Sequence, residues 1–150
     1  MAATAVSTQS IDLVHQFMDD VVVNRDYSRI ADLSEDFVQH DIVRGMDVHG
    51  HDEFEEMRRM FDAAFSDTLR TNVLSFASED GEYVCSVDTL QATHDGEFVG
   101  IAPTGASVEI QAVTMYRIQN EQIAEMWNLG NWLGLLQQIG AVSPLDELAP

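Results

Sequence analysis

Residues 70–93 read RTNVLSFASEDGEYVCSVDTLQAT, and apolar and polar side chains alternate on both sides of Asp80-Gly81. Alternation with a period of two is typical of a β-strand that buries one face. Asp-Gly between two such runs is a strong signal for a tight hairpin turn. The stretch therefore predicts two antiparallel strands, at about 70–78 and 82–93.

The same alternation continues toward the C-terminus. Residues 107–118 and 122–129 form two more strand-like runs, and Asn120-Glu121 between them marks a turn. Beyond them, apolar residues at helical spacing over 132–139 predict a short helix. The C-terminal half is therefore predicted to be an antiparallel meander followed by one helix.

The N-terminal half has helical spacing instead. Its apolar residues recur every three or four positions over 11–22 and over 52–66, and Asp26 can cap a short helix between these two. At the start of the third helix, Asp52 and Glu55 have the form of a capping box. Helices followed by an antiparallel meander predict an α+β fold, with the helices packed on one face of a strongly curved sheet. A cavity between helices and such a sheet is a natural site for a small molecule.

The composition predicts a single domain. The 150 residues, 45% of them hydrophobic, suffice for one domain with one core. We expect residues 1–150 to form this domain, with 1–9 and 143–150 as loosely held tails. The sequence shows neither a basic leader nor an apolar span, and Cys85 is alone, so no signal peptide, membrane anchor or intramolecular disulfide is expected. These features predict a cytoplasmic protein.

The charge is strongly one-sided. The chain has 26 Asp and Glu residues against seven basic residues, all of them arginine, and its net charge is −19. Such a surface repels phosphate backbones and anionic lipid, which excludes nucleic acids and membranes as partners. The acids are spread from Asp12 to Glu147, which indicates a charged folded surface of the kind that high salt screens. We therefore predict a protein from a halophile.

Several short motifs follow one another in a fixed order. They are FVQHD at 37–41, AFSD at 64–67, THDGEFVG at 93–100, PTG at 103–105, YRI at 116–118, EMW at 125–127 and QQIG at 137–140. In order and spacing they resemble the SnoaL-like polyketide cyclases over about positions 10–140. The resemblance implies a cone-shaped barrel of the nuclear transport factor 2-like fold, built as a homodimer through the sheets. It also implies an aldol ring closure of a polyketide, without a metal or a nucleotide cofactor.

Such a reaction needs a carboxylate base in an apolar pocket and hydrogen-bond donors for the enolate. The resemblance places the acid/base aspartate at position 131, where Asn131 offers only hydrogen bonds. Glu125, which shares a face with Trp127 in a regular strand, is the nearest replacement base, and its alternative role is an ion pair with Arg117. Asp88 is the other candidate base, at a strand position that is either buried or solvated.

The family pattern also carries His40, Asp41 and His94, which we expect at the mouth of the cavity. Among these, His94 is a further catalytic candidate, because a histidine can relay protons or donate to an enolate oxygen. Its alternative role is to anchor the loop that follows it. The predicted substrate site includes His40 and Asp41 together with four aromatic residues that suit a planar ligand: Phe98, Tyr116, Trp127 and Trp132. His49 and His51 lack a regular ligand spacing, so no metal site is predicted.

Three functions are open at this point. The leading one is a cofactor-independent cyclase that acts on a hydrophobic multi-carbonyl small molecule by acid/base chemistry. The second is a non-catalytic small-ligand-binding module, which Asn131 favours because an amide keeps the hydrogen-bonding shape of a carboxylate without its basicity. The third is a different reaction on the same fold, as an isomerase, dehydratase or epoxide hydrolase, because a fold does not fix its chemistry.

Overall fold

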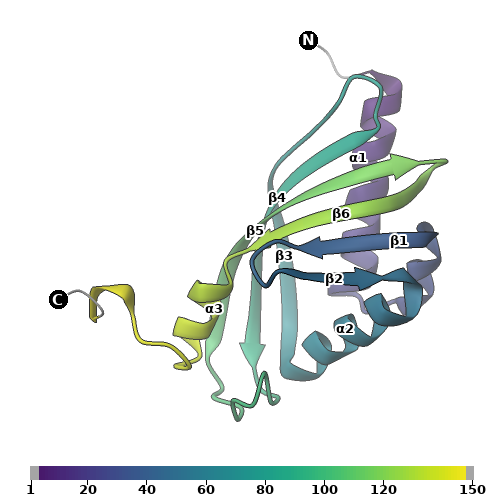
Figure 1. Ribbon diagram of the computed structural model, residues 1–150. Helices are drawn as coiled ribbons and strands as arrows, with labels where there is room; N and C mark the ends of the chain where they lie inside the picture. The colour runs from purple at the N-terminus through teal and green to yellow at the C-terminus, as the bar shows by residue number, and fades with distance from the viewer. Residues whose placement is uncertain (1–3, 148–150) are drawn as a thin grey trace.

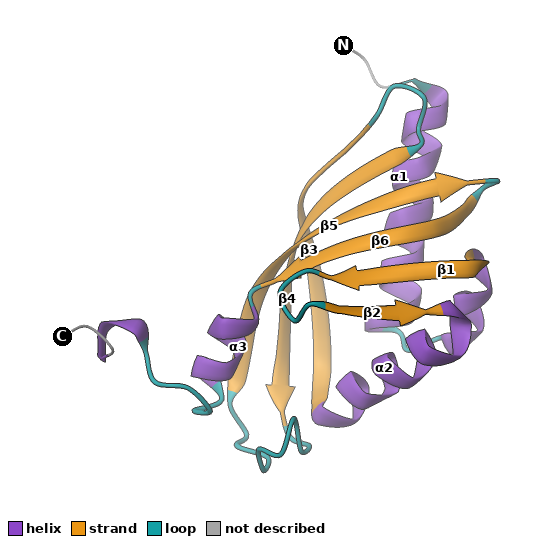
Figure 2. Cartoon of the chain, in the orientation of Figure 1, coloured by secondary structure: helices purple, strands orange, loops and turns teal. Residues whose placement is uncertain are grey.

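The computed structural model describes residues 4–147 as one curved sheet with helices packed on it (Figures 1 and 2). In chain order the elements are α1 (Ala5–Met18), the π-helical turn η1 (Asp19–Val23), the 3-10 helix η2 (Tyr27–Asp32), β1 (Leu33–Asp41), β2 (Met46–His49), α2 (Gly50–Ala64), β3 (Phe65–Ala77), β4 (Tyr83–His94), β5 (Ser107–Gln119), β6 (Gln122–Gly130), α3 (Trp132–Gln138) and the 3-10 turn η3 (Leu145–Glu147). The predicted α+β architecture is confirmed. Helix α1 includes residues 5–9, which the sequence assigns to a loose tail, and residues 1–3 and 148–150 lie outside the described part.

The six strands form a sheet in the order β2-β1-β6-β5-β4-β3. Neighbouring strands are antiparallel except β1 and β6, which run parallel. This pair departs from the predicted antiparallel sheet, because β1 comes from the helical half of the chain and joins the meander by a long crossover. The sheet curls without closing, so the fold is an open cone (Figure 1).

Strand alternation divides the sheet into a concave inner face and an outer face. The registers pair Val84 with Tyr116 and Tyr116 with Met126, and all three side chains are buried. Even-numbered residues of β4, of β5 up to Tyr116 and of β6 from Ala124 on therefore face inward, and the odd-numbered residues of these segments face outward. This parity decides which of the predicted site residues can reach a cavity under the helices.

The helices α1 and α2 pack on the inner face. Thr4 caps α1 by accepting a hydrogen bond from the Ser7 amide. Val14 and Phe17 are fully buried, and they pack with Phe54 of α2 in a cluster that includes the inner residues of the sheet. Each fully buried side chain of this size contributes roughly 1.5–3 kcal/mol to stability. Within residues 4–147, every helix is too short or too polar to span a bilayer.

Both predicted turns are confirmed. At the β3–β4 hairpin the Asp80 side chain accepts from the Glu82 amide, and Gly81 has φ 72°. At the β5–β6 turn Asn120 and Glu121 both have positive φ, 52° and 60°. A turn with two consecutive residues at positive φ has a twist that matches the twist of the flanking strands.

The start of α2 differs from the predicted capping box. The helix begins at Gly50, two residues before Asp52, and its N-cap residue is His49. Instead of Glu55, the Glu53 carboxylate accepts the hydrogen bond of the His49 amide, at 2.7 Å. The carboxylate in the first turn still satisfies a free backbone donor. The predicted cap of η2 is confirmed, since Asp26 accepts from the Ser28 amide.

Candidate active site

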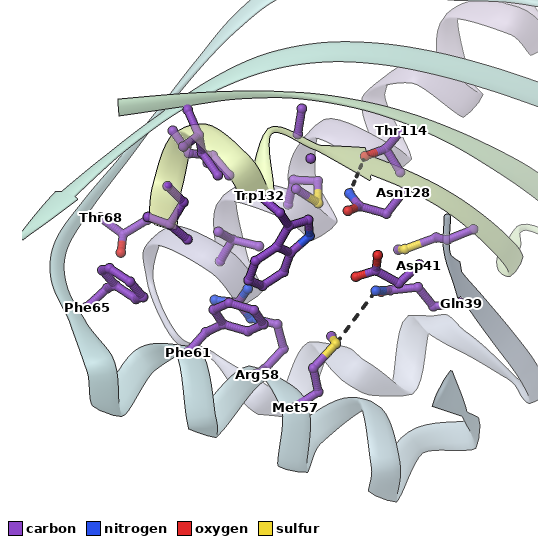
Figure 3. Close-up of a pocket in the computed structure, with 18 of the residues that line it drawn as sticks. Gln39, Asp41, Met57, Arg58, Phe61, Phe65, Thr68, Thr114, Asn128 and Trp132 are labelled. Carbon is purple, nitrogen blue, oxygen red and sulfur yellow. Dashed lines mark hydrogen bonds between the residues drawn. The ribbon is translucent and has the colours of Figure 1, made fainter. Parts of the chain in front are cut away.

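A cavity of about 170 Å³ lies between the inner face of the sheet and helices α2 and α3 (Figure 3). Most of its wall is apolar, and the larger apolar side chains are Met18, Val22, Phe54, Met57, Phe61, Phe65, Leu90, Val108, Ile110, Met126, Trp132 and Leu135. An apolar lining with a few polar groups is the usual form of a small-molecule site. The polar groups therefore decide what this cavity can do.

Asp41 brings a carboxylate into the wall. It is the last residue of β1, and its side chain is 1% exposed. One carboxylate oxygen accepts from the Arg44 amide at 2.9 Å, and the other accepts from Arg44 Nε at 2.7 Å. The parallel register places Asp41 next to Asn128, and in Figure 3 it lies near Gln39. A nearly buried carboxylate thus stands in an apolar wall with one arginine to balance its charge.

Hydrogen-bond donors stand in the same wall. Asn128 donates to Thr114 Oγ1 at 2.9 Å, and Gln39 donates to the Met57 sulfur at 3.6 Å (Figure 3). The Tyr116 side chain is fully buried, and its hydroxyl has no hydrogen-bond partner among the described residues. Burial, followed by the nearby charge of Asp88, raises the pKa of Tyr116 far above its ordinary value, so the hydroxyl keeps its proton. These groups can donate to a carbonyl or enolate oxygen.

Asp62 of α2 is a second carboxylate of the wall. It accepts from Arg58 at 2.8 Å and from the Tyr27 hydroxyl at 2.7 Å, and Arg25 Nε lies 3.9 Å away. Burial lowers the pKa of Arg58, against the opposing charge of Asp62. Burial and the hydrogen bond to Asp62 raise the pKa of Tyr27. Through Tyr27 and Arg25, Asp62 ties α2 to the start of η2 and to the residues just before it.

Glu125 and Trp127 lie on the outer face, because their positions in β6 are odd-numbered. Glu125 pairs with Arg117 Nε at 3.0 Å, which is the alternative role considered for it, and also contacts His40 Nε2 at 2.8 Å. The His40 ring stacks on Trp127 at 5.4 Å, and its Nδ1 lies 2.8 Å from Asp47. A neutral imidazole has only one N–H, so two carboxylate partners indicate a protonated His40. None of these residues is among the described residues that line the cavity.

This cluster predicts a pH-dependent contribution to stability. The hydrogen bond to Glu125, followed by that to Asp47, raises the pKa of His40 above its ordinary 6.5. The hydrogen bond from His40, against a smaller effect of burial, lowers the pKa of Glu125 below its ordinary 4.5. The histidine's stabilisation is complete below pH 6.5 and is lost as the pH rises through the raised value. The glutamate's stabilisation is complete above pH 4.5 and is lost as the pH falls through the lowered value.

Chemical denaturation of His40→Gln should therefore show its largest deficit against the wild type between pH 4.5 and 6.5, and a smaller one at pH 9. His49→Gln is the control, because this histidine is exposed and its side chain bonds to no carboxylate among the described residues. A deficit that stays constant from pH 5 to pH 9 would contradict a charged His40.

Asp88 faces inward, as its even number requires, but it lies beneath Arg70 and outside the described cavity wall. Arg70 Nη2 lies 2.9 Å from one carboxylate oxygen, and Asn72 donates to the same oxygen at 3.0 Å. Ser86 donates to the other oxygen at 2.7 Å. The side chains of Arg70 and Asp88 are 3% and 4% exposed, so the pair is buried. Both carboxylate oxygens of Asp88 thus have partners within the protein, which indicates a structural role.

His94 holds the loop between β4 and β5. Its Nδ1 shares a hydrogen bond with Thr104 Oγ1, and its backbone carbonyl accepts from the Gly105 amide. The loop runs close to α2 at Gly96, where an added Cβ would lie 1.9 Å from a backbone oxygen of that helix. Phe98 of this loop stacks behind Trp132 at 5.8 Å. Of these residues only Trp132 lines the cavity, and Phe98 supports it from outside the described wall.

Asn131 is the N-cap of α3. Its side-chain oxygen accepts the hydrogen bond of the Gly134 amide at 3.0 Å. Asparagine and aspartate are equally good in this position. The side chain is not among the described residues of the wall, so the residue at the expected acid/base position serves the helix.

The polar wall residues that the prediction missed include Gln39, Arg44, Asp62 and Asn128. Asn128 directly follows Trp127, and only the parity of β6 separates an inward from an outward side chain. One usable signal was present. Arg117 and Glu125 stand opposite each other in the register, and such an ion pair marks the outer face.

A curved α+β sheet with helices and an apolar cavity on its inner face defines a small-molecule site of the nuclear transport factor 2-like class. The sequence model of the SnoaL-like polyketide cyclases matches residues 12–139. The chain therefore belongs to the SnoaL-like polyketide cyclase family. No curated protein matches it.

Solved structures share this fold. A candidate SnoaL-like polyketide cyclase from Jannaschia sp. CCS1 has a TM-score of 0.85 at 18% identity, over 96% of this chain and 99% of its own. AclR, a candidate hydroxylase from Streptomyces galilaeus, has a TM-score of 0.81 at 26% identity, over 95% and 88%. IdmH, a candidate polyketide cyclase from Streptomyces antibioticus, has a TM-score of 0.74 at 23% identity, over 88% and 99%. Because these names describe different activities, the fold alone does not choose the reaction.

Proposed function

We propose that this protein binds a hydrophobic multi-carbonyl small molecule in its cavity and catalyses an acid/base aldol cyclisation or isomerisation of it. The observation that carries the proposal is the nearly buried carboxylate of Asp41 in an apolar wall that also holds Asn128 and Tyr116. This assigns the base to Asp41 instead of Glu125 or Asp88, whose carboxylates are engaged elsewhere.

In the cyclisation, Asp41 removes a proton from a carbon between two carbonyl groups of the ligand. The enolate carbon then forms a bond to a second carbonyl carbon of the same molecule, and the resulting alkoxide takes the proton back from Asp41. Hydrogen bonds from Tyr116 and Asn128 stabilise the negative charge on oxygen, which is worth most in a cavity that excludes water. Trp132 and Phe61 provide flat walls for the ring system.

A non-catalytic binding module is the second candidate. It is favoured by Arg44, which donates to both oxygens of Asp41, and by Asn131 in the cap of α3. An isomerase, dehydratase or epoxide hydrolase would use the same cavity with a different ligand.

Ring closure of an anthraquinone-type polyketide ester, followed by absorbance, tests the proposal. Wild type, Asp41→Asn and Glu125→Gln are compared in molar KCl, because a net charge of −19 on a protein we place in the cytoplasm of a halophile calls for strong screening. Turnover that depends on Asp41 supports the enzyme. Tight binding without turnover supports the binding module.

We also propose that two copies of the chain associate through the outer face of the sheet. Two rows of directly paired residues cross β3, β4, β5 and β6 there: Phe76, Cys85, Met115 and Trp127, and Leu74, Val87, Val113 and Leu129. Several of these apolar side chains are about half exposed in the single chain. A continuous apolar patch of this kind is typical of an interface between protein chains.

Val113→Glu is expected to convert a dimer, of twice 16.7 kDa, into a monomer, because it buries an unpaired charge in the middle of this patch. Light scattering after size exclusion measures the mass. Met60→Glu, at an exposed apolar residue of α2, is the matched control and should leave the mass unchanged. A wild-type protein that runs as a monomer at all concentrations would exclude the dimer.

A further inference from the structure

Arg44 differs from the other arginines of the chain in how it uses its guanidinium group. The other six each place a terminal amino group against a protein oxygen; these are Arg25, Arg29, Arg58, Arg59, Arg70 and Arg117. Arg44 donates to Asp41 through its backbone amide and Nε alone. Neither of its terminal amino groups donates to any described residue. The edge of the guanidinium that carries these two groups is therefore free to bind a ligand.

This free edge belongs to a cavity residue. Arg44 is part of the wall, and its guanidinium carbon stands 4.4 Å above the ring of Trp132 and 5.9 Å from that of Phe61. The stacking and the bond from Nε to Asp41 fix the plane of the group. A fixed guanidinium edge with two N–H donors matches the two oxygens of a carboxylate.

A cation with free hydrogen-bond donors is unusual in the cavity of such an acidic chain. With a net charge of −19, the surface repels anions, and Arg44 holds Asp41 through its backbone amide and Nε alone, which leaves its terminal amino groups for an anionic ligand. The negative charge of Asp41 beside Arg44 also disfavours a doubly charged group such as phosphate. The site therefore suits a singly charged, planar oxyanion attached to an apolar body.

We propose that the ligand occupies this cavity as a free carboxylic acid, and that Arg44 binds its carboxylate. This rests on the proposed function and makes it more specific, because the substrate class becomes an ionised acid instead of an ester. Asp41 positions the guanidinium through Nε, and the terminal amino groups hold the ligand. The aromatic rings of Trp132 and Phe61 contact the body of the ligand.

Binding of anthraquinone-2-carboxylic acid and of its methyl ester tests this assignment. Fluorescence reports the binding, since Trp132 is in the wall and the chain's second tryptophan, Trp127, is on the outer face. We expect the wild type to bind the acid roughly 10- to 100-fold more tightly than the ester, as charge-assisted hydrogen bonds allow. Arg44→Gln should remove this preference by weakening the binding of the acid alone. Arg44→Lys should restore part of it, because lysine keeps the positive charge but lacks the paired N–H donors of a guanidinium.

Arg59→Gln is the control, because Arg59 also lies over an aromatic ring, that of Tyr27, but outside the cavity. It should leave both affinities unchanged. Ester binding as tight as acid binding by the wild type overturns the role of Arg44 and leaves the proposed function standing. Binding of neither compound overturns the proposed function and this assignment together. The comparison of the two compounds on the wild type needs no variant, so it stays decisive even where Arg44→Gln misfolds.

Discussion

Arg70→Met is expected to lower the free energy of unfolding by about 3–5 kcal/mol, because it leaves the Asp88 carboxylate buried without its cation. Arg70 lies between Asp88 of β4 and Asp19 at the start of η1, so it also joins the helical layer to the sheet. Asn72 and Ser86 still donate to Asp88 in this variant, but two neutral donors do not balance a buried charge. Denaturant titration followed by circular dichroism measures the loss.

Two comparisons make this result specific. Arg59→Met removes an exposed ion pair with Glu55 and should cost less than about 1 kcal/mol. The double variant Arg70→Met with Asp88→Leu should recover most of the stability, since replacing both partners of a buried pair by apolar side chains is often neutral or favourable. A loss in Arg70→Met no larger than that in Arg59→Met would show that solvent reaches the pair.

The parts of the fold that were predicted correctly rest on local chemistry. Asp80-Gly81 and Asn120-Glu121 specify their turns through backbone angles that few other residue pairs adopt readily. The alternation in β4 and β5 reflects one buried face, and the same alternation placed Asp88 mid-strand among small and apolar neighbours. These signals need no knowledge of distant parts of the chain.

The site was harder to predict because it depends on which face of each strand turns inward. Glu125, Trp127 and Leu129 share a face, as expected, but the packing of α1 and α2 makes their face the outer one. A shift of one position separates Trp127 from Asn128, and no local property of β6 fixes that choice. The parallel pairing of β1 with β6 could not be predicted from local sequence either. This pairing brings Asp41 beside Asn128.

Asn131 illustrates the limit of a motif. The resemblance predicted an acid/base carboxylate at this position, and in the structure the position is the N-cap of α3. The Asn131 oxygen satisfies a helix amide, so the side chain can be explained without catalysis. In Asn131→Asp we accordingly expect no gain of turnover, because the new carboxylate would cap the same helix.

Asp41→Asn should reduce turnover of the anthraquinone-type polyketide, offered as the free acid or as the ester, by about 10²- to 10⁴-fold, the usual contribution of a general base. The substitution keeps the size of the side chain and one acceptor oxygen, so the Arg44 amide retains its acceptor while Arg44 Nε loses its own, and circular dichroism checks the fold. What is lost is the ability to take a proton from carbon and return it to oxygen. Binding of the ligand should change far less than turnover, and measuring kcat and KM separately distinguishes the two.

Glu125→Gln is the matched carboxylate control for Asp41→Asn, because Glu125 is on the outer face, paired with Arg117 and His40. It should retain turnover within about twofold, since Glu125 lies outside the cavity wall and each of its two partly exposed ion pairs contributes only about 1 kcal/mol or less. The reverse pattern, with Glu125→Gln inactive and Asp41→Asn active, would move the base to the outer face and make the cavity a secondary feature. If the wild type binds the ligand and turns over none of it, Asp41 is a positioning residue for Arg44 and the chain is a binding member of a cyclase family.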